Sequence, residues 1–400
     1  MADVIACPDC AAVQRLPGLR RGGVVQCRRC GSTLERSNGR SLDAALACAI
    51  ATFLLLFPAN LLPLMSVSLL GSDRASRLAA GVALMWQQGF MLMAIVVAAQ
   101  AVVLPFFRFG LLASVLAALR LGRAGPWVGI GFRWSERLDL WAMPDVFLIG
   151  LFVGYGRVRH SLPVQIEAGG WCVIGAAFLT MVTRASLDRR TIWRLIEPPE
   201  MVAPSGLACT SCDLVTDQHE PGSRCPRCRA RLWPRKPFSI MRTAALVATG
   251  YLLYPVANIY PMSIAVQLGS PKPHTIFDGV QELIGANLWP LAAIIFMTSI
   301  GIPMLKLIGL TWLCISVRRK SRWALRTKTR VYRVIHEIGR WSNVDIYTIV
   351  VFLPLMQVGQ LVSIHTATGA AAFLAVVVAS MVAARWFDPR LMWDAAGEPR

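Results

Sequence analysis

The sequence has few charged residues for its length. Of its 400 residues, 16% are charged and 55% are hydrophobic, whereas a soluble domain usually carries about a quarter charged residues. Acidic residues are the scarcer sign, with 22 against 41 lysines and arginines and a net charge of +19. Because the apolar residues gather in long runs, composition places the chain among membrane proteins. Its positive charge suits either nucleic acid or an anionic membrane surface.

The motifs of common enzymes are also missing. The sequence contains no Walker A motif, no GxSxG and no GxGxxG. His336-Glu337 resembles the start of HExxH, but Arg340 stands where the second histidine is needed. We therefore expect no enzymatic activity and no ATP hydrolysis. The N-terminal segment is polar and contains cysteines, so no cleavable signal peptide is expected.

Eight apolar runs predict membrane-spanning helices, since a hydrocarbon core of about 30 Å needs roughly 20 apolar residues per helix. A polar stretch separates the first four runs from the last four. The runs cover residues 42–65, 79–119, 140–156, 169–182, 240–266, 283–317, 341–362 and 367–384. We expect an all-α polytopic membrane protein with four transmembrane helices in each half.

The basic residues orient the predicted helices by the positive-inside rule. They are frequent before the first run, between the second and third, after the fourth, and between the sixth and seventh, and they are sparse in the alternate loops. Both termini and both cysteine-containing segments are therefore predicted to face the cytoplasm. An anionic leaflet on that side explains the excess charge, so no nucleic-acid partner is expected.

The two halves are predicted to be repeats of one unit. Ala59–Pro63 (ANLLP) corresponds to Ala257–Pro261 (ANIYP) at a spacing of 198 residues, and Trp141–Phe147 corresponds to Trp341–Tyr347 at a spacing of 200. An even number of spans per half makes the repeats parallel rather than inverted. Parallel repeats are related by an axis along the membrane normal, an arrangement found in some transporters.

Eight of the eleven cysteines form four CxxC pairs. The spacings C-x2-C-x16-C-x2-C and C-x2-C-x12-C-x2-C are typical of zinc ribbons, in which four thiolates surround one metal ion. The two sets are Cys7, Cys10, Cys27 and Cys30, and Cys209, Cys212, Cys225 and Cys228. Four thiolates leave no open coordination position, so two structural zinc ions per chain are expected. Iron in a rubredoxin-like site, a redox dithiol and a nucleic-acid-binding ribbon remain alternatives.

These features divide the chain into four predicted domains. They are a first zinc ribbon at 1–40, a first transmembrane repeat at 41–195, a second zinc ribbon at 196–236 and a second transmembrane repeat at 237–400. The repeat register assigns each ribbon to the four helices that follow it.

Polar residues inside the apolar runs are the default functional candidates. Ser299 and Lys306 share one helix face, which we expect to line a polar cavity. Asp345 opens the seventh run, and a Lys306–Asp345 pair would take up or release a proton as its surroundings change. Thr348 and Ser380 add polarity to the same half. The structural alternatives are that Lys306 extends its ammonium group to the membrane surface and that Asp345 only begins a helix.

The first-half counterparts of Lys306 and Asp345 are Arg108 and Asp145. Other polar positions are not shared, because Ala101 stands at the place of Ser299. Since the halves have diverged, we expect the second one to carry the function.

The whole set of motifs resembles the paraquat-inducible protein A family of Gram-negative inner membranes. The resemblance rests on a cysteine knuckle, an Ala-Asn-x-x-Pro first span, a Pro-x-x-[Lys/Arg] second span and a Trp-Ser-x-x-Asp-[Val/Ile]-[Phe/Tyr] third span in each half. It also includes the closing Asp-Pro-Arg-x-x-Trp at Asp388–Trp393. The first half departs from the pattern at Arg108, where the second has Lys306, and at Ala142, where the second has Ser342.

The resemblance implies a function and a partner. Members of the family work with periplasmic mammalian-cell-entry (MCE) domain proteins, which form tunnels between the two membranes, and pass phospholipids into or out of those tunnels. It therefore implies an inner-membrane component of intermembrane phospholipid transport, either proton-coupled or passive. The alternative is a membrane scaffold or stress sensor whose zinc ribbons recruit a cytoplasmic partner.

Overall fold

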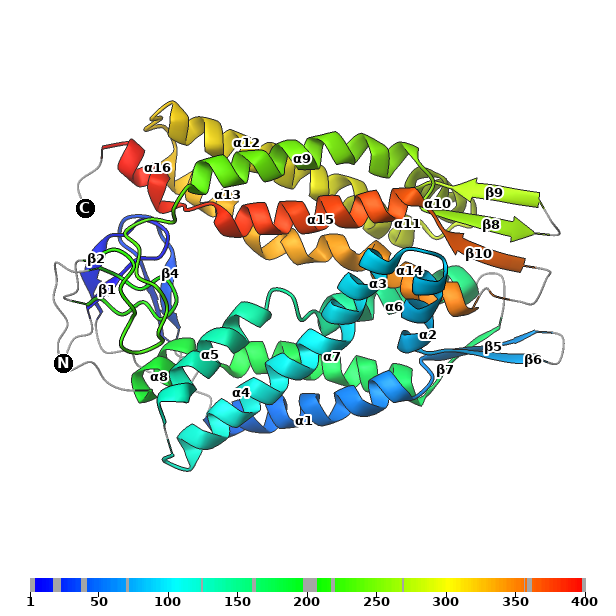
Figure 1. Cartoon of the computed structure of the whole chain (residues 1–400), viewed down its shortest axis with the longest axis horizontal. Helices are drawn as coiled ribbons and strands as arrows, with labels where there is room; N and C mark the ends of the chain where they lie inside the picture. The colour runs from blue at the N-terminus through cyan, green and yellow to red at the C-terminus, as the bar shows by residue number, and fades with distance from the viewer. Residues whose placement is uncertain are drawn as a thin grey trace.

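The computed structural model describes residues 4–16, 23–36, 42–69, 72–123, 125–159, 163–196, 207–216, 220–267, 270–355, 357 and 362–397. Helices form an elongated bundle, with the cysteine segments at one end and small β-sheets at the other (Figure 1). We call these the ribbon end and the sheet end.

Six helices in the described part of the chain are long and apolar enough to cross a membrane. They agree with six of the eight predicted runs. They are α1 (Leu42–Leu61), the continuous helix of α3 (Met91–Ala98), η1 (Ala99–Val103) and α4 (Leu104–Arg120), α7 (Ala168–Ser186), α9 (Ser239–Ile259), the continuous helix of α11 (Trp289–Phe296), η2 (Met297–Gly301) and α12 (Ile302–Arg318), and α15 (Thr368–Trp386). The two continuous helices contain 30 residues each.

The third and seventh predicted runs form shorter helices, α6 (Pro144–Arg159) with 16 residues and α14 (Val344–Leu355) with 12. Each follows an amphipathic helix at the ribbon end, α5 (Pro126–Leu138) or α13 (Leu325–Ile338). An Arg120–Asp43 ion pair of 2.6 Å holds the end of α4 beside the start of α1. Strand β7 (Val164–Ile166), by contrast, pairs with β5 (Met65–Leu69), which follows α1 at the sheet end. The chain therefore returns along the whole length of α1 through α5 and α6 together.

The prediction of an all-α protein is wrong at the sheet end. Antiparallel three-stranded sheets of order β6-β5-β7 and β10-β8-β9 follow the first helix of each repeat. Their remaining strands are β6 (Ser72–Ser76), β8 (Ser263–Gln267), β9 (Ser270–His274) and β10 (Val362–Thr366). The five residues of β5, Met-Ser-Val-Ser-Leu, alternate apolar and polar side chains as a strand does. They adjoin an apolar run, and hydropathy alone does not separate the two.

The second predicted run also divides. Helix α2 (Leu78–Gln87) ends in a turn at Gly89, whose φ of +89° is the left-handed region that favours glycine, and the long helix begins at Met91. Its equivalent α10 (Ile276–Gly285) is likewise separate from α11. Short helices α8 (Arg189–Leu195) and α16 (Arg390–Ala395) close the two repeats.

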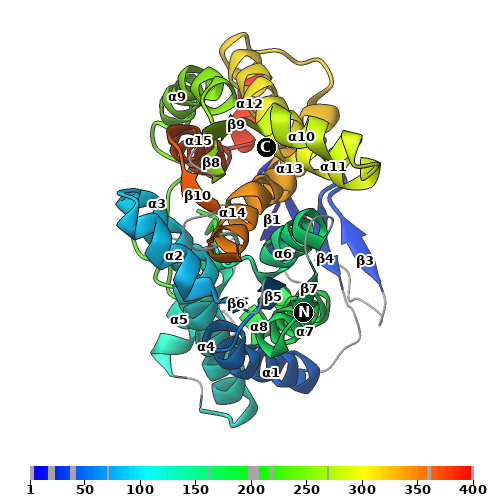
Figure 2. The same cartoon turned by 90° about the vertical axis from the view of Figure 1, so that its right-hand side faces the viewer.

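Helices α6 and α14 lie at the centre of the molecule, where the two repeats meet (Figure 2). Residues that are 200 apart in the sequence contact each other there. The rings of Phe147 and Tyr347 are 5.4 Å apart, and the Asn343 amide lies 3.6 Å from the Met143 sulfur. Equivalent residues meet only beside a rotation axis, so a pseudo-two-fold axis runs between α6 and α14. This arrangement agrees with parallel repeats.

Ribbon 1 (the described residues of 4–36) contains β1 (Val4–Ala6), β2 (Val13–Arg15), β3 (Val24–Gln26) and β4 (Thr33–Arg36). It packs mainly against the second repeat, although Glu35 of β4 also forms a 2.8 Å ion pair with Arg194 of α8 in the first repeat. Arg333 of α13 donates a hydrogen bond to the Cys30 carbonyl at 3.1 Å, and Arg326 donates one to the Arg29 carbonyl at 2.9 Å. The Arg29 guanidinium lies over the ring of Trp393 in α16.

Ribbon 2 (the described residues of 207–232) packs mainly against the first repeat. Its four cysteines share a core with the first-repeat residues Phe132 and Trp193. Arg189 of α8 forms a 3.2 Å ion pair with Asp213. A side chain at Gly129 of α5 would lie 2.2 Å from the Arg227 carbonyl, so the two backbones are in direct contact. Each ribbon therefore packs mainly against the repeat that does not follow it in the sequence, an arrangement that we call crosswise docking.

Candidate functional site

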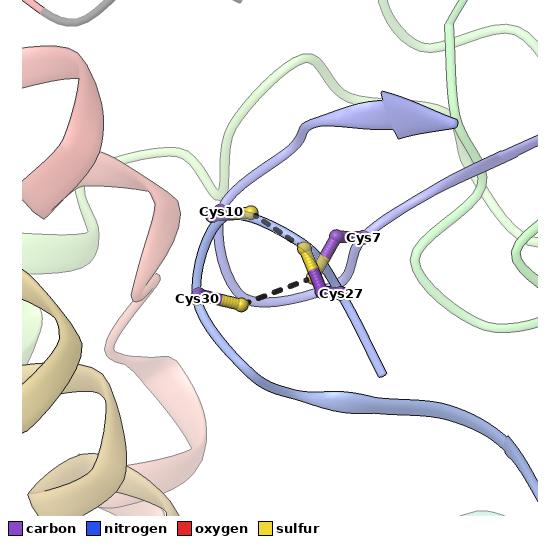
Figure 3. Close-up of side chains that lie close together, drawn as sticks. All are labelled: Cys7, Cys10, Cys27 and Cys30. Carbon is purple, nitrogen blue, oxygen red and sulfur yellow. Dashed lines mark hydrogen bonds between the residues drawn. The ribbon is translucent and has the colours of Figure 1, made fainter. Parts of the chain in front are cut away.

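The first candidate site is the pair of cysteine clusters. Four sulfur atoms converge in ribbon 1, with Cys7 and Cys30 3.5 Å apart and Cys10 and Cys27 3.6 Å apart (Figure 3). Ribbon 2 repeats these distances between Cys209 and Cys228 and between Cys212 and Cys225. All eight side chains are buried, and the sulfurs of each set lie within 4.8 Å of one another. Tetrahedral bonds of about 2.3 Å place sulfurs roughly 3.8 Å apart, so the geometry fits a metal ion.

The backbone at each CxxC turn explains how two thiolates reach one point. The residue after the second cysteine is left-handed in all four turns, with φ of 61° at Ala11, 70° at Gly31, 57° at Asp213 and 56° at Arg229. This conformation lets the amide of Ala11 donate to the Cys7 carbonyl at 2.9 Å, and the other turns repeat the bond. Only one of the four positions is the glycine that the conformation favours.

Polar groups outside the clusters support the sulfur atoms. The Gln14 side-chain amide donates to the Cys27 sulfur at 3.0 Å, and the Ser211 backbone amide donates to the Cys209 sulfur at 3.4 Å. Such donors stabilise thiolate charge around a bound metal. Burial raises the pKa of nearby Asp9, an effect that hydrogen bonding to Ser32 and the charge of Arg333 partly oppose.

The second candidate site lies inside the bundle of the second repeat. Lys306 of α12 is 2% exposed, and its ammonium donates to the Gly339 carbonyl at 3.3 Å. It forms no ion pair with any residue that the structure describes. Asp345 at the start of α14 is 8% exposed; it lies near the Ser299 hydroxyl and forms no ion pair with a described residue. The structure therefore buries both members of the predicted pair and does not bring them together.

The other predicted polar residues are also buried. Thr348 donates to the Val344 carbonyl at 3.0 Å within α14 and lies 3.3 Å from the Gly150 carbonyl of α6 across the repeat interface. Ser380 donates to the Val377 carbonyl at 2.9 Å. These hydroxyls are satisfied by helix carbonyls, so they line the interior without being left unpaired.

The equivalent region of the first repeat is a network of ion pairs. Arg108 contacts Asp139, and Arg184 bridges Asp139 at 2.9 Å and Asp145 at 2.5 Å. Arg340 of the second repeat approaches Asp145 at 3.9 Å. The second repeat lacks two of these partners, because Gly339 stands at the position of Asp139 and Ala384 at that of Arg184. Lys306 is therefore uncompensated where its counterpart Arg108 is paired.

Several polar residues near this region were missed by the sequence reasoning. Among the described residues, buried atoms without a hydrogen-bond partner include Ser342 Oγ, Asn343 Oδ1 and Gln100 Nε2 of such residues, and also Oδ2 of the predicted Asp345. Gln100 lies in the π-helix η1, and Ser299 lies in the equivalent π-helix η2. Such π-helical turns are frequent at functional sites. The prolines that follow η1 and η2 are the only sequence signal for them, and proline is not specific for this conformation.

Comparisons with known proteins identify the family. The model of the paraquat-inducible protein A family matches residues 42–197 and again residues 240–397, one match for each repeat. The "Intermembrane transport protein PqiA" of Escherichia coli K12 is 31% identical over 98% of this chain and 95% of its own. The "Lipophilic envelope-spanning tunnel protein A" of the same strain is 30% identical over 98% and 92%. The "Probable intermembrane transport protein" of Haemophilus influenzae is 25% identical over 98% and 95%.

No solved structure matches this chain. The double match of the family model coincides with the two sets of equivalent helices, and the alignment with the first relative covers 98% of this chain. The chain belongs to the paraquat-inducible protein A family.

Proposed function

We propose that this protein is an inner-membrane component of intermembrane lipid transport that passes phospholipid to or from a periplasmic MCE-domain tunnel protein. The observation that carries the proposal is full-length similarity to proteins named for intermembrane transport and an envelope-spanning tunnel. The interior of the second repeat supports it, because buried polar atoms without partners need water or a ligand.

The topology proposed for this function has eight crossings. The α5–α6 and α13–α14 segments would complete the third and seventh crossings, since each carries the chain from the ribbon end to the sheet end. Both termini and both ribbons would face the cytoplasm of a Gram-negative cell, as the arginine distribution indicates. The sheet end would then face the periplasm and the MCE-domain partner. In this arrangement the four proposed domains are zinc ribbon 1 (1–40), transmembrane repeat 1 (41–195), zinc ribbon 2 (196–236) and transmembrane repeat 2 (237–400).

We propose zinc as the metal of both clusters. Eight buried cysteines in two sets of four have the geometry of closed structural sites. A bound zinc ion would supply folding free energy to segments too small to fold alone. Metal analysis of the purified protein tests this: two zinc ions per chain are expected, and iron with visible absorption would contradict it.

We propose that Lys306 and Asp345 couple proton movement to transport. Both are buried, and Lys306 lacks the carboxylate that its first-repeat counterpart has. Ser299, Thr348 and Ser380 would line the same interior, where their hydroxyl groups would bind water. Since Lys306 and Asp345 are not paired here, a pair would form only in a second conformation of the α12–α14 region.

Substitution of these two residues tests the function. Lys306→Ala and Asp345→Ala are expected to abolish envelope-barrier function in a complementation assay while the protein remains folded and inserted. Lys320→Ala, an exposed cation just after α12, is the matched control and should keep full function. Wild-type barrier function in both variants would contradict the proposed coupling site.

The second candidate function is a scaffold or stress sensor that recruits a cytoplasmic protein. A cavity of about 670 Å³ between the two ribbons and α13 favours it. In that case substitutions on the ribbons would abolish function, and Lys306→Ala would leave it unchanged. Phospholipid crosslinked to a photoreactive residue at position 299 would favour transport instead.

A further inference from the structure

Arg157 of α6 is an arginine without an assigned role. It belongs to the first repeat, and its counterpart in the second is the uncharged Gln357. Its side chain is half-buried, yet it makes no hydrogen bond or ion pair with any residue in the described ranges. The charges that act on it most are the carboxylates of Asp345 and Glu282, both in the second repeat. Arg159, by contrast, is exposed and donates to the Tyr155 hydroxyl at 3.0 Å.

The guanidinium lies at a place where the two repeats pack unequally. A side chain at Gly81 of α2 would lie 2.1 Å from the Val350 carbonyl, so α2 packs directly on α14. At the equivalent Gly279 of α10, a side chain would instead lie 2.6 Å from Nη2 of Arg157. On one side of the pseudo-two-fold axis, α2 is in backbone contact with α14. On the other side, the Arg157 guanidinium fills the equivalent space between α6 and α10.

This position suits an anionic group at the membrane boundary. Arg157 is two residues from the end of α6, close to the sheet end, and Phe277 and Trp289 of the flanking helices are 53% and 60% exposed. A partly buried guanidinium gains most from an anion that accepts two parallel hydrogen bonds, and the two non-bridging oxygens of a phosphodiester can accept them. These exposed apolar side chains on the flanking helices would contact the acyl chains of the same molecule.

We propose that Arg157 binds the phosphodiester of a phospholipid at the seam between α6 and α10, and that the Asp345 carboxylate competes for the same guanidinium. The proposal rests on the lipid-transport function proposed above and assigns its headgroup site. Because the first repeat supplies the cation and the second supplies the competing anion, movement between the repeats would exchange one partner for the other.

Binding of a short-chain phosphatidylglycerol to the delipidated full-length protein in detergent tests this site. Arg157→Gln installs the residue of the second repeat and is expected to weaken binding at least about tenfold, because it removes a charge-assisted hydrogen bond. Asp345→Asn is expected to tighten binding by about threefold, since it removes a nearby competing charge. Arg159→Gln on the same helix is the matched control and should bind like the wild type.

A second variant tests the seam without removing the charge. Gly279→Ala displaces only the flexible end of Arg157 and is expected to weaken binding severalfold, whereas Gly285→Ala in the same helix meets no atom within 4 Å and should have no effect. Thermal unfolding of each variant confirms that it is folded, and Arg157→Lys should restore part of the affinity.

The outcomes separate this proposal from the transport function. Wild-type affinity in Arg157→Gln would overturn the headgroup site and leave the transport proposal standing. The site would also be overturned if Arg157→Gln weakened the binding of a diacylglycerol of the same chain length as much as it weakens the binding of phosphatidylglycerol, because diacylglycerol has no phosphate. Glycerol phosphate binding as tightly as the lipid would assign the site to a soluble phosphate ester. A wild-type protein that binds no phospholipid would overturn both proposals.

Discussion

Crosswise docking predicts that unfolding of ribbon 1 destabilises the helices of the second repeat that it contacts. Cys30→Ser removes one of four sulfur ligands, and a ribbon of this size depends on its metal for folding. Unfolding of ribbon 1 would break the 3.2 Å Arg333–Asp9 ion pair and the hydrogen bond from Arg333 to the Cys30 carbonyl. Half-exposed interactions of this kind contribute about 1 kcal/mol each.

Two further exposed interactions, the Arg326 bond to the Arg29 carbonyl and the stacking of Arg29 on Trp393, add about 0.5 kcal/mol each and bring the total to about 3 kcal/mol. That free energy corresponds to about a hundredfold faster amide exchange wherever local opening controls it. Hydrogen–deuterium exchange of the full-length protein should therefore show faster exchange in α13 and α16. Amides of α5, which contacts ribbon 2, should keep their wild-type rates.

The reciprocal variant supplies the control. Cys225→Ser disrupts ribbon 2, which contacts α5 and α8 through Arg227 and Asp213. It should accelerate exchange in those two helices and spare α13 and α16. If Cys30→Ser instead deprotects α5 more than α13 and α16, or if both variants deprotect all four helices equally, the crosswise arrangement is refuted.

Three other substitutions probe local features. Ala11→Gly should stabilise ribbon 1 by about 1 kcal/mol, because it relieves a φ of 61°, and it should slow metal release to a chelator. Gly150→Ala should destabilise the protein by about 2 kcal/mol in thermal unfolding because a side chain there meets α14 at 2.7 Å, whereas Gly154→Ala, with 3.8 Å of space, should be nearly neutral. Burial opposes ionisation of Asp388, but hydrogen bonds and charge from Arg390 prevail and lower its pKa. A lowered carboxyl pKa stabilises the fold at neutral pH and loses that contribution as pH falls below about 4, so Asp388→Asn should lower the melting temperature at pH 7 and much less at pH 3.

The parts of this structure that could be predicted from sequence are those with strong local signals. A run of about 20 apolar residues has few alternatives to a membrane helix, and helices such as Leu42–Leu61 and Ser239–Ile259 agree with the predicted runs. The CxxC spacing likewise predicted both cysteine clusters, because each turn presents two thiolates to one point.

Features that depend on packing could not be predicted in the same way. Hydropathy does not show where α14 ends or that Met65–Leu69 forms a strand, since apolar residues serve both structures. The crosswise docking of the ribbons depends on surface contacts such as Arg333 to Cys30, which have no sequence periodicity. The separation of Lys306 from Asp345 in this structure has the same cause. Neighbouring spans need not place their side chains at the same depth, and the position of α14 against α6 sets where Asp345 lies.

Divergence between the repeats explains why one of them retains uncompensated charge. A charge held inside an apolar bundle is costly unless it is paired, and the first repeat pairs Arg108 through Asp139 and Arg184. The second repeat has neither partner, with Gly339 and Ala384 at those positions, and among the described residues Lys306 has a carbonyl acceptor but no carboxylate to offset its charge. A fold selected only for stability would not keep such a lysine. The paired repeat is thus suited to act as a rigid support, and the unpaired repeat is suited to respond to a proton or an anion.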